Sequence, residues 1–177
     1  MMNLIERFFS KEKSDRSQIR KNFSAYFFSL PEHEWIATSP IRVHFEKLIS
    51  VLPSGLLSSL MTKYPVTFIR SFELSGRGGA GMVLNNTIVV FPEFQRLLES
   101  GKASAVAYLA HELAFVLYEL EEGKTDTLMA EVEADKFVCD LGLTFELEEL
   151  LLLLDETIEK RLRLTYLTIN HFTSGNN

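Results

Sequence analysis

Two short runs of β-branched and aromatic residues interrupt a chain that otherwise has the apolar spacing of helices. The first run, VTFIRSFEL, covers residues 66–74, and the second, MVLNNTIVVF, covers residues 82–91. Asn85 and Asn86 divide the second run into two strand pieces, because asparagine tolerates the left-handed backbone angles of a tight turn. These pieces are enough for one small sheet, antiparallel by preference or else mixed. The remainder of the fold must be built from helices.

The apolar spacing on both sides of the strand runs predicts where these helices lie. Residues 1–30 combine aromatic and charged residues and should form one or two amphipathic helices that end at Pro31, with their phenylalanines packed over the core. A further helix is expected to start with Pro40 at its first position and to end before Pro53, and a shorter one to end before Pro65. After the sheet, helices are expected over residues 92–99, 103–121, 126–141 and, as one or two helices, 145–172.

This order of elements predicts a single α+β domain over residues 1–177. No internal repeat or long linker divides the chain. Its parts are a helical N-terminal part (1–65), the small sheet (66–91) and the C-terminal helices (92–172), before a polar tail.

Composition excludes several classes of protein. The formal net charge of -6, without a dense run of Lys and Arg, argues against nucleic-acid binding. The single cysteine, Cys139, cannot form an internal disulfide and is expected to be a small core residue. No stretch approaches the roughly 20 apolar residues of a membrane span, and the N-terminus has no secretory signal pattern. A soluble, cytoplasmic protein is therefore expected.

The segment YLAHELAFVLYEL, residues 108–120, contains part of a metal-binding pattern. In a helical H-E-x-x-H, two histidines four residues apart hold zinc from one face of the helix, and the glutamate acts as general base. His111 and Glu112 match the first two positions, whereas Phe115 stands where the second histidine would be.

A second segment, AEVEADKFVCDLG, covers residues 130–142. Glu131 and Asp135 are four residues apart, so both carboxylates project from one face of a helix. This spacing suits a third metal ligand together with a carboxylate that orients a ligating histidine.

The two segments, preceded by the strand NTIVVF and followed by ETIEKRLRLTYL, resemble the gluzincin peptidases, especially the HtpX-like and minimal members of that group. The resemblance covers about residues 82–167 and implies a compact zincin-like fold. It implies that His111 is the first zinc ligand, Glu131 the third ligand, Glu112 the general base and Asp135 the outer partner of His111.

Phe115 departs from this pattern at the position that matters most. His111 and Glu131 alone make a poor zinc site, so no cofactor is expected, or zinc if the site works. Without metal, His111 is expected to hydrogen-bond Asp135 or Glu131. A rewired site that recruits Cys139 or one of the other histidines, which are His33, His44 and His171, is an alternative.

The sequence therefore predicts a degenerate, catalytically inactive zincin-like protein, with Glu112 a vestigial base, that binds a protein or peptide partner in the former substrate cleft. One alternative is an active zinc-dependent endopeptidase with a non-standard third ligand. Another is a purely structural domain whose cleft is filled by side chains. The glycine-rich SGRGGAG, residues 75–81, is interpreted as a flexible connection between strands and not as a phosphate-binding loop.

Overall fold

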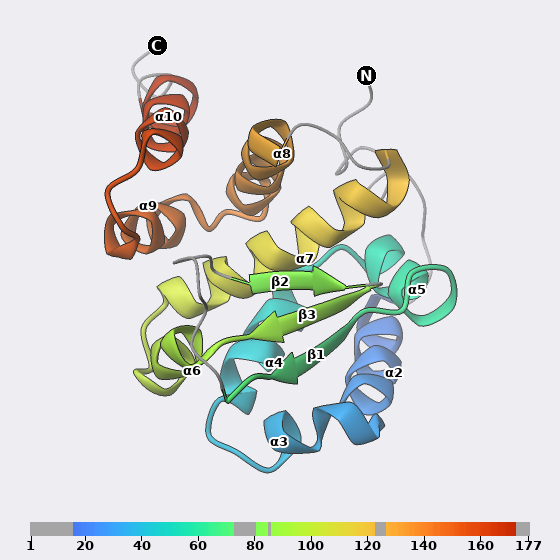
Figure 1. Ribbon diagram of the computed structural model, residues 1–177. Helices are drawn as coiled ribbons and strands as arrows, with labels where there is room; N and C mark the ends of the chain where they lie inside the picture. Colours follow the sequence, from blue (N-terminus) through green and yellow to red (C-terminus); the bar gives the residue numbers. More distant parts are fainter. Residues whose placement is uncertain (1–15, 73–80, 85, 123–126, 173–177) are drawn as a thin grey trace.

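The computed structural model describes residues 16–72, 81–84, 86–122 and 127–172. Its N-terminal elements are α2 (Arg16–Ser29), η1 (Pro31–His33), α3 (Glu34–Ala37), α4 (Arg42–Val51), α5 (Ser54–Thr62) and β1 (Thr67–Arg70). Then follow β2 (Gly81–Leu84), β3 (Thr87–Val90), α6 (Pro92–Glu99), α7 (Ser104–Glu122), α8 (Thr127–Asp140), α9 (Thr144–Leu153), α10 (Ile158–Leu167) and the π-helical turn η2 (Thr168–Phe172). The described chain is mostly helical with one small sheet, which confirms the α+β class (Figure 1).

The helix predicted to start at Pro40 begins two residues later, at Arg42. The predicted start at Pro40 was therefore wrong, whereas the helix ends before Pro53 as expected. None of the described helices has the length and apolar content needed to cross a membrane.

The sheet is mixed, with the strand order β1-β3-β2. Strand β2 pairs antiparallel with β3 through a turn in which Asn86 has the left-handed φ of 69°, as the sequence indicated. Strand β1 pairs parallel with β3, in the register Thr67 to Thr87. The preferred antiparallel sheet was therefore wrong for β1, because only the hairpin is constrained by its short turn. β1 is free to join the open side of β3, whose Ile88 and Val90 are fully buried.

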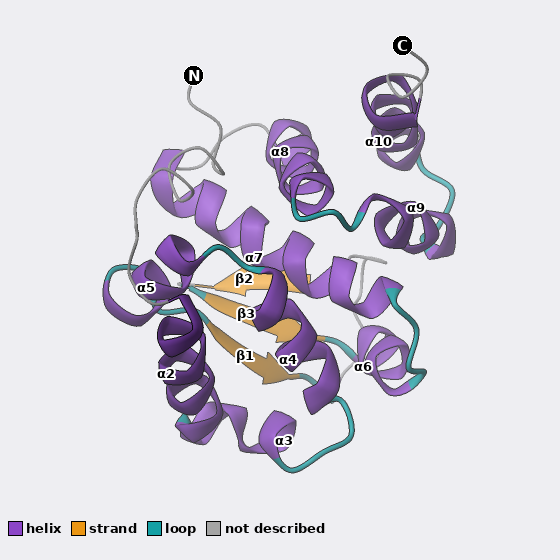
Figure 2. Ribbon diagram, turned by 180° about the vertical axis from the view of Figure 1, so that it is seen from behind, coloured by secondary structure: helices purple, strands orange, loops and turns teal. Residues whose placement is uncertain are grey.

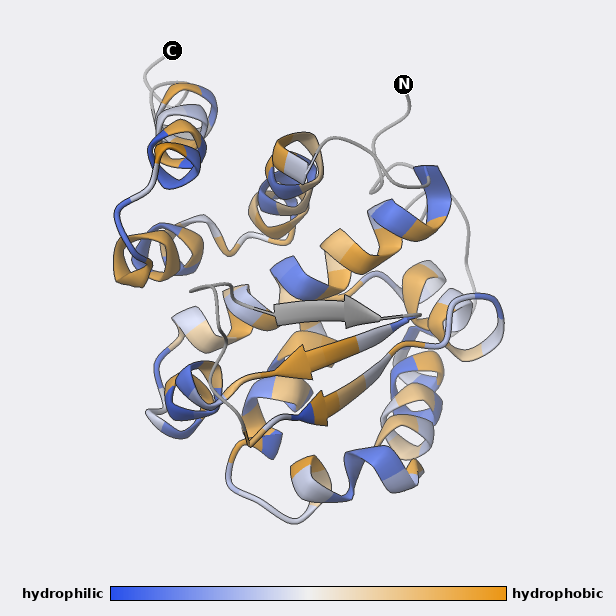
Figure 3. Cartoon of the chain, in the orientation of Figure 1, coloured by the Kyte–Doolittle hydropathy of each residue, from blue (hydrophilic) through white to orange (hydrophobic). Residues whose placement is uncertain are grey.

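Helix α7 is the centre of the molecule. Figures 1 and 2, which view the sheet from opposite sides, show α7 and α4 covering the same face of the sheet. Fourteen residues of α7 are buried, among them Tyr108, whose ring stacks on that of Phe94 with centroids 4.3 Å apart. Such a helix, apolar on all sides, is stable only inside a core. Figure 3 shows the matching apolar residues along β3.

His33 connects the N-terminal helices to the sheet. Its side chain is fully buried, its Nδ1 donates to the Phe27 carbonyl at 2.8 Å, and its Nε2 accepts the Phe68 N–H at 2.9 Å. Burial lowers the pKa of His33, and the two hydrogen bonds require its neutral form. The aromatic rings of Phe23 and Phe27 pack there as expected, while Phe8 and Phe9 lie outside the described residues.

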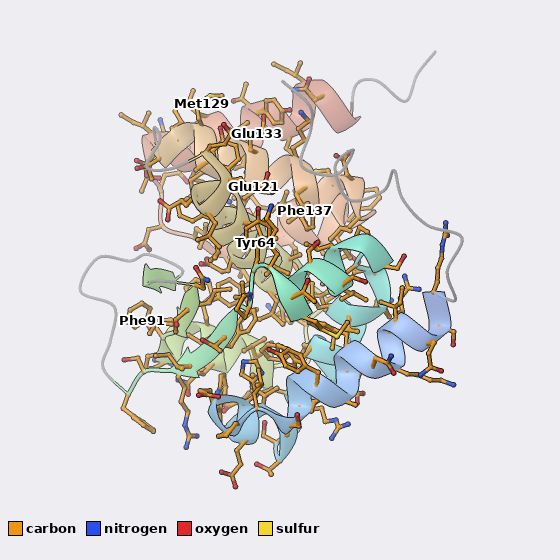
Figure 4. The ribbon with its side chains drawn as sticks, turned by 90° about the vertical axis from the view of Figure 1, so that its right-hand side faces the viewer. Tyr64, Phe91, Glu121, Met129, Glu133 and Phe137 are labelled. Atoms are coloured by element: carbon orange, nitrogen blue, oxygen red, sulfur yellow. The ribbon has the colours of Figure 1, made fainter. Side chains whose placement is uncertain are left out.

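Tyr64, which follows α5, reaches the far end of α7. Its hydroxyl donates to Glu121 at 3.3 Å, and the two side chains lie together in Figure 4. Phe137 of α8 is fully buried, whereas Met129 near the start of that helix is half exposed. The other buried residues of α8 include Ala130, Ala134 and Val138, and Asp135 of the candidate site is buried with them.

Candidate functional site

Helix α7 places His111 and Glu112 in the interior of the protein. Their exposed fractions are 3% and 5%. The surrounding sequence is rich in alanine and leucine, which favour helix, and the alanines allow α8 to pack closely against α7. Two polar side chains in such a core need partners in the folded structure.

Helix α8 brings those partners to His111, as the four-residue spacing predicted. The Nε2 atom of His111 lies 3.0 Å from Glu131 Oε2, and its Nδ1 atom lies 2.9 Å from Asp135 Oδ1. The expected hydrogen bond of His111 to Asp135 or Glu131 is thus present with both residues. Both ring nitrogens of His111 are occupied by carboxylates from the same face of α8.

A fourth residue, Arg163 of α10, completes the cluster. Its Nε and Nη2 atoms donate to the two Asp135 carboxylate oxygens, each at 2.7 Å, and its Nη1 atom donates to Glu131 Oε2 at 2.6 Å. The fork of Arg163 on Asp135 is the bidentate arrangement that makes Arg–carboxylate pairs strong and directional. Arg163 is only 8% exposed. We refer to His111, Glu131, Asp135 and Arg163 as the buried ionic cluster.

Two contacts at the start of α10 position Arg163. The Thr157 hydroxyl accepts the Lys160 backbone N–H at 3.1 Å and caps the helix. The Lys160 ammonium group donates to the Leu154 carbonyl at 2.8 Å, which connects α10 to the end of α9. Arg163 then follows one turn into the helix.

Arg163 is not among the candidate residues that the sequence indicated. A usable signal was present, since Arg163 lies three residues after Lys160 and four before Leu167, and all three are buried on one face of α10. An arginine on the apolar face of a helix implies an acidic partner elsewhere in the chain. Which carboxylate it meets is decided only by tertiary packing.

The cluster holds two positive and two negative charges. Burial alone would lower the pKa of His111, as does the charge of Arg163, but the hydrogen bonds to Asp135 and Glu131 raise it to about 9. The pKa values of Glu131 and Asp135 are lowered, because the hydrogen bonds and charges of His111 and Arg163 outweigh the effect of burial. With His111 protonated, both of its nitrogens donate. The 3.4 Å approach of Arg163 Nη2 to His111 Nδ1 is then a contact between like charges and not a hydrogen bond.

Glu112 lies beside the cluster without joining it. Burial is the main cause that raises its pKa, to about 7, with Glu131 adding to the effect and the positive charges of His111 and Arg163 opposing it. In the described part of the chain, the Glu112 carboxyl interacts with the cluster only electrostatically, without a hydrogen bond to it. It is therefore the residue of the site whose charge is least compensated.

The residues present do not fit a zinc ion. Two ligand atoms on a tetrahedral zinc, each about 2.1 Å from the metal, lie about 3.4 Å apart. The His111 and Glu131 atoms lie 3.0 Å apart, the spacing of a direct hydrogen bond, and the same Glu131 oxygen receives Arg163. Phe115 is partly buried, packs against the core and has no ligand atom. Among the described residues, no group of three His, Cys, Asp or Glu side chains has the geometry to hold a metal.

The other candidate residues lie apart from this cluster. Cys139 is buried at 8% exposure, and burial raises the pKa of its thiol to about 11. His33 and His44 are buried with lowered pKa values, each mainly because of burial, and each hydrogen-bonds backbone, Phe27 and Leu98 respectively. The side chain of His171 and residues 75–80 of the glycine-rich segment lie outside the described residues.

Comparison of the chain with protein-family models, with curated proteins and with solved structures found no match.

Proposed function

We propose that this protein is a non-catalytic, zincin-like protein that acts by binding a protein or peptide partner. The observation that supports this most directly is the 2.6 Å ion pair between Arg163 and Glu131. It commits a carboxylate that a peptidase would need as a metal ligand to a charge inside the protein. With Phe115 at the position of the second histidine, hydrolysis through a metal-bound water has too few groups to support it.

The edge strand β2 supports the second half of the proposal. β2 is an outer strand of the sheet, paired only on its β3 side among the described strands. In both Figure 1 and Figure 4, β2 lies on the side of the sheet that faces α8 and α10. An extended segment of a partner can add to such an edge through backbone hydrogen bonds. This would be the former substrate path used for binding alone.

Metal content and proteolysis test the loss of catalysis. Protein purified without a tag or chelator should contain far less than one zinc per chain by elemental mass spectrometry, because zinc sites need at least three protein ligands. It should also show no chelator-sensitive peptide hydrolysis. Stoichiometric zinc, together with hydrolysis abolished by Glu112→Gln, would overturn the proposal.

Photo-crosslinking tests the binding role. A benzoylphenylalanine at position 115 should capture a discrete partner in cells, whereas the same group at Phe145, which is 73% exposed on α9, serves as the control. Equal capture from both positions, or none from position 115, would favour a purely structural domain.

A second candidate function is an active zinc-dependent endopeptidase with a non-standard third ligand. The observation in its favour is the pKa of Glu112, which burial raises to about 7. A general base works best when its pKa lies near the working pH. This candidate predicts bound metal in the wild-type protein and its loss in His111→Ala.

A further inference from the structure

We propose that Arg163 keeps a metal ion out of this site and takes over the charge balance and cross-linking that zinc supplies in the peptidases these motifs resemble. The inference rests on the proposed function and deepens it. It assigns the loss of metal to a residue on a third helix as well as to Phe115. Restoring the missing histidine is then insufficient to restore a metal site.

One carboxylate oxygen of Glu131 receives two donors. Oε2 of Glu131 receives both His111 Nε2 at 3.0 Å and Arg163 Nη1 at 2.6 Å. A metal ion bound by His111 and Glu131 would sit between these two atoms, in place of the histidine N–H, and would share Oε2 with the guanidinium. The metal and the guanidinium charge would then lie on opposite sides of one carboxylate oxygen.

The positive charge of Arg163 is permanent. A guanidinium stays protonated in proteins, so it cannot yield to a metal by losing a proton. With Arg163 in place, a divalent ion would be added beside a fixed positive charge in a site that is already neutral, with two cations and two anions. Burial makes that repulsion strong.

The contacts of Arg163 hold its side chain in place. The side chain of Arg163 is 9% exposed, and its bidentate contact with Asp135 leaves both Asp135 oxygens occupied. The cap at Thr157 and the contact of Lys160 with Leu154 fix the start of the helix that carries it. Displacing the guanidinium would leave it buried without its partners, which is costly.

Arg163 also extends the connections between helices. A zinc ion held by His111 and Glu131 would connect α7 to α8 only. Arg163 pairs with Asp135 and Glu131 of α8, and both of these carboxylates bind His111 of α7, so the ion pairs connect α10 to α8 and, through α8, to α7. The cluster thus joins three helices where a metal would join two.

The experiment compares zinc binding by three variants. These are Phe115→His, Phe115→His with Arg163→Gln, and Phe115→His with Arg161→Gln. Arg161 is the matched control, because it lies on the same helix but is 72% exposed and pairs with the exposed Glu156. Zinc affinity is measured by competition with a chromophoric chelator, and stoichiometry by elemental mass spectrometry.

Phe115→His alone should bind zinc weakly, and adding Arg163→Gln should tighten binding at least about 100-fold, the upper range for changes around a metal site. Adding Arg161→Gln should change nothing. Comparable affinity of Phe115→His with and without Arg163→Gln would overturn the inference. So would the absence of zinc binding in a folded double variant, because removing the block would then have opened no site.

A second measurement does not depend on the folding of the double variant. The guanidinium Nε–H signal of Arg163 in an NMR spectrum of Phe115→His should stay unchanged at equimolar zinc, because weak binding leaves the site largely empty at that concentration. A loss or large shift of that signal with uptake of one zinc would show that the metal displaces Arg163 readily and would refute the inference.

The two proposals fail in different ways. The proposed function fails on the wild-type protein, if that protein holds zinc and cleaves peptides. The inference about Arg163 fails on the variants, while the wild-type protein stays free of zinc.

Discussion

Replacing Glu112 by glutamine is expected to stabilise the protein at neutral and alkaline pH. Glu112 is 5% exposed, and burial raises its pKa from 4.5 to about 7. A group with a raised pKa in the folded state contributes its stabilisation fully below the unfolded pKa and loses it as the pH rises through the folded pKa. Between about pH 4.5 and pH 7 the unfolded carboxyl ionises while the folded one stays protonated. The free energy of unfolding therefore falls across this window.

The magnitude follows from the size of the shift. Each pKa unit is worth about 1.4 kcal/mol, so the shift of Glu112 corresponds to about 3 kcal/mol of lost stability at pH 8. Glutamine has nearly the same shape and cannot ionise. Glu112→Gln should thus have little effect at pH 4.5 and raise the free energy of unfolding by about 3 kcal/mol at pH 8.

Urea unfolding of both proteins at pH 4.5, 6 and 8 measures this difference, and the contributions of all other titrating groups cancel in the comparison. Glu119→Gln is the control, since Glu119 lies on the same helix and is only partly buried. If Glu112→Gln showed the same effect at all three pH values or destabilised the protein at pH 8, the raised pKa of Glu112 would be refuted. Either result would mean that the ionised carboxylate has a strong partner in the folded protein.

Three further predictions concern other buried groups. Arg163→Gln should destabilise the protein by about 3–5 kcal/mol in urea unfolding, because it leaves buried carboxylates unpaired, whereas Arg161→Gln should stay within about 0.5 kcal/mol. His33→Ala should cost about 3 kcal/mol, since two buried backbone groups lose their partner. The lowered pKa of His33 means that its stabilisation is present above about pH 6.5 and falls at lower pH, so the variant should be less acid-sensitive in unfolding at pH 5 and pH 8. Cys139 should react with a thiol reagent at pH 8 at least about tenfold more slowly in the folded protein than in urea, because it is buried with a pKa near 11.

The residues of the buried ionic cluster depend on one another for stability. Breaking a buried ion pair is more damaging than never having had one, because the remaining charge loses its compensation. Once Arg163 pairs with Asp135 and Glu131, each residue of the cluster is needed by the others for stability. Replacing His111, Glu131 or Asp135 alone would leave a buried charge without its partner.

The sequence by itself determined the features that depend on neighbours along the chain. The spacing of Glu131 and Asp135 places both on one face of α8. The left-handed turn at Asn86 and the antiparallel hairpin follow from local backbone preferences. In each case the physical cause acts over four residues or fewer.

The tertiary structure decided which distant faces meet. The parallel pairing of β1 with β3 is not specified by either strand, since both edges of β3 offer the same backbone groups. Arg163 reaches Asp135 across 28 residues of chain, and His33 reaches Phe68 across 35. Periodicity tells which face of a helix is buried, but the partner of a buried charge depends on how all the helices pack together. This is why the motif was visible in the sequence, while the residue that neutralises it appeared only in the folded protein.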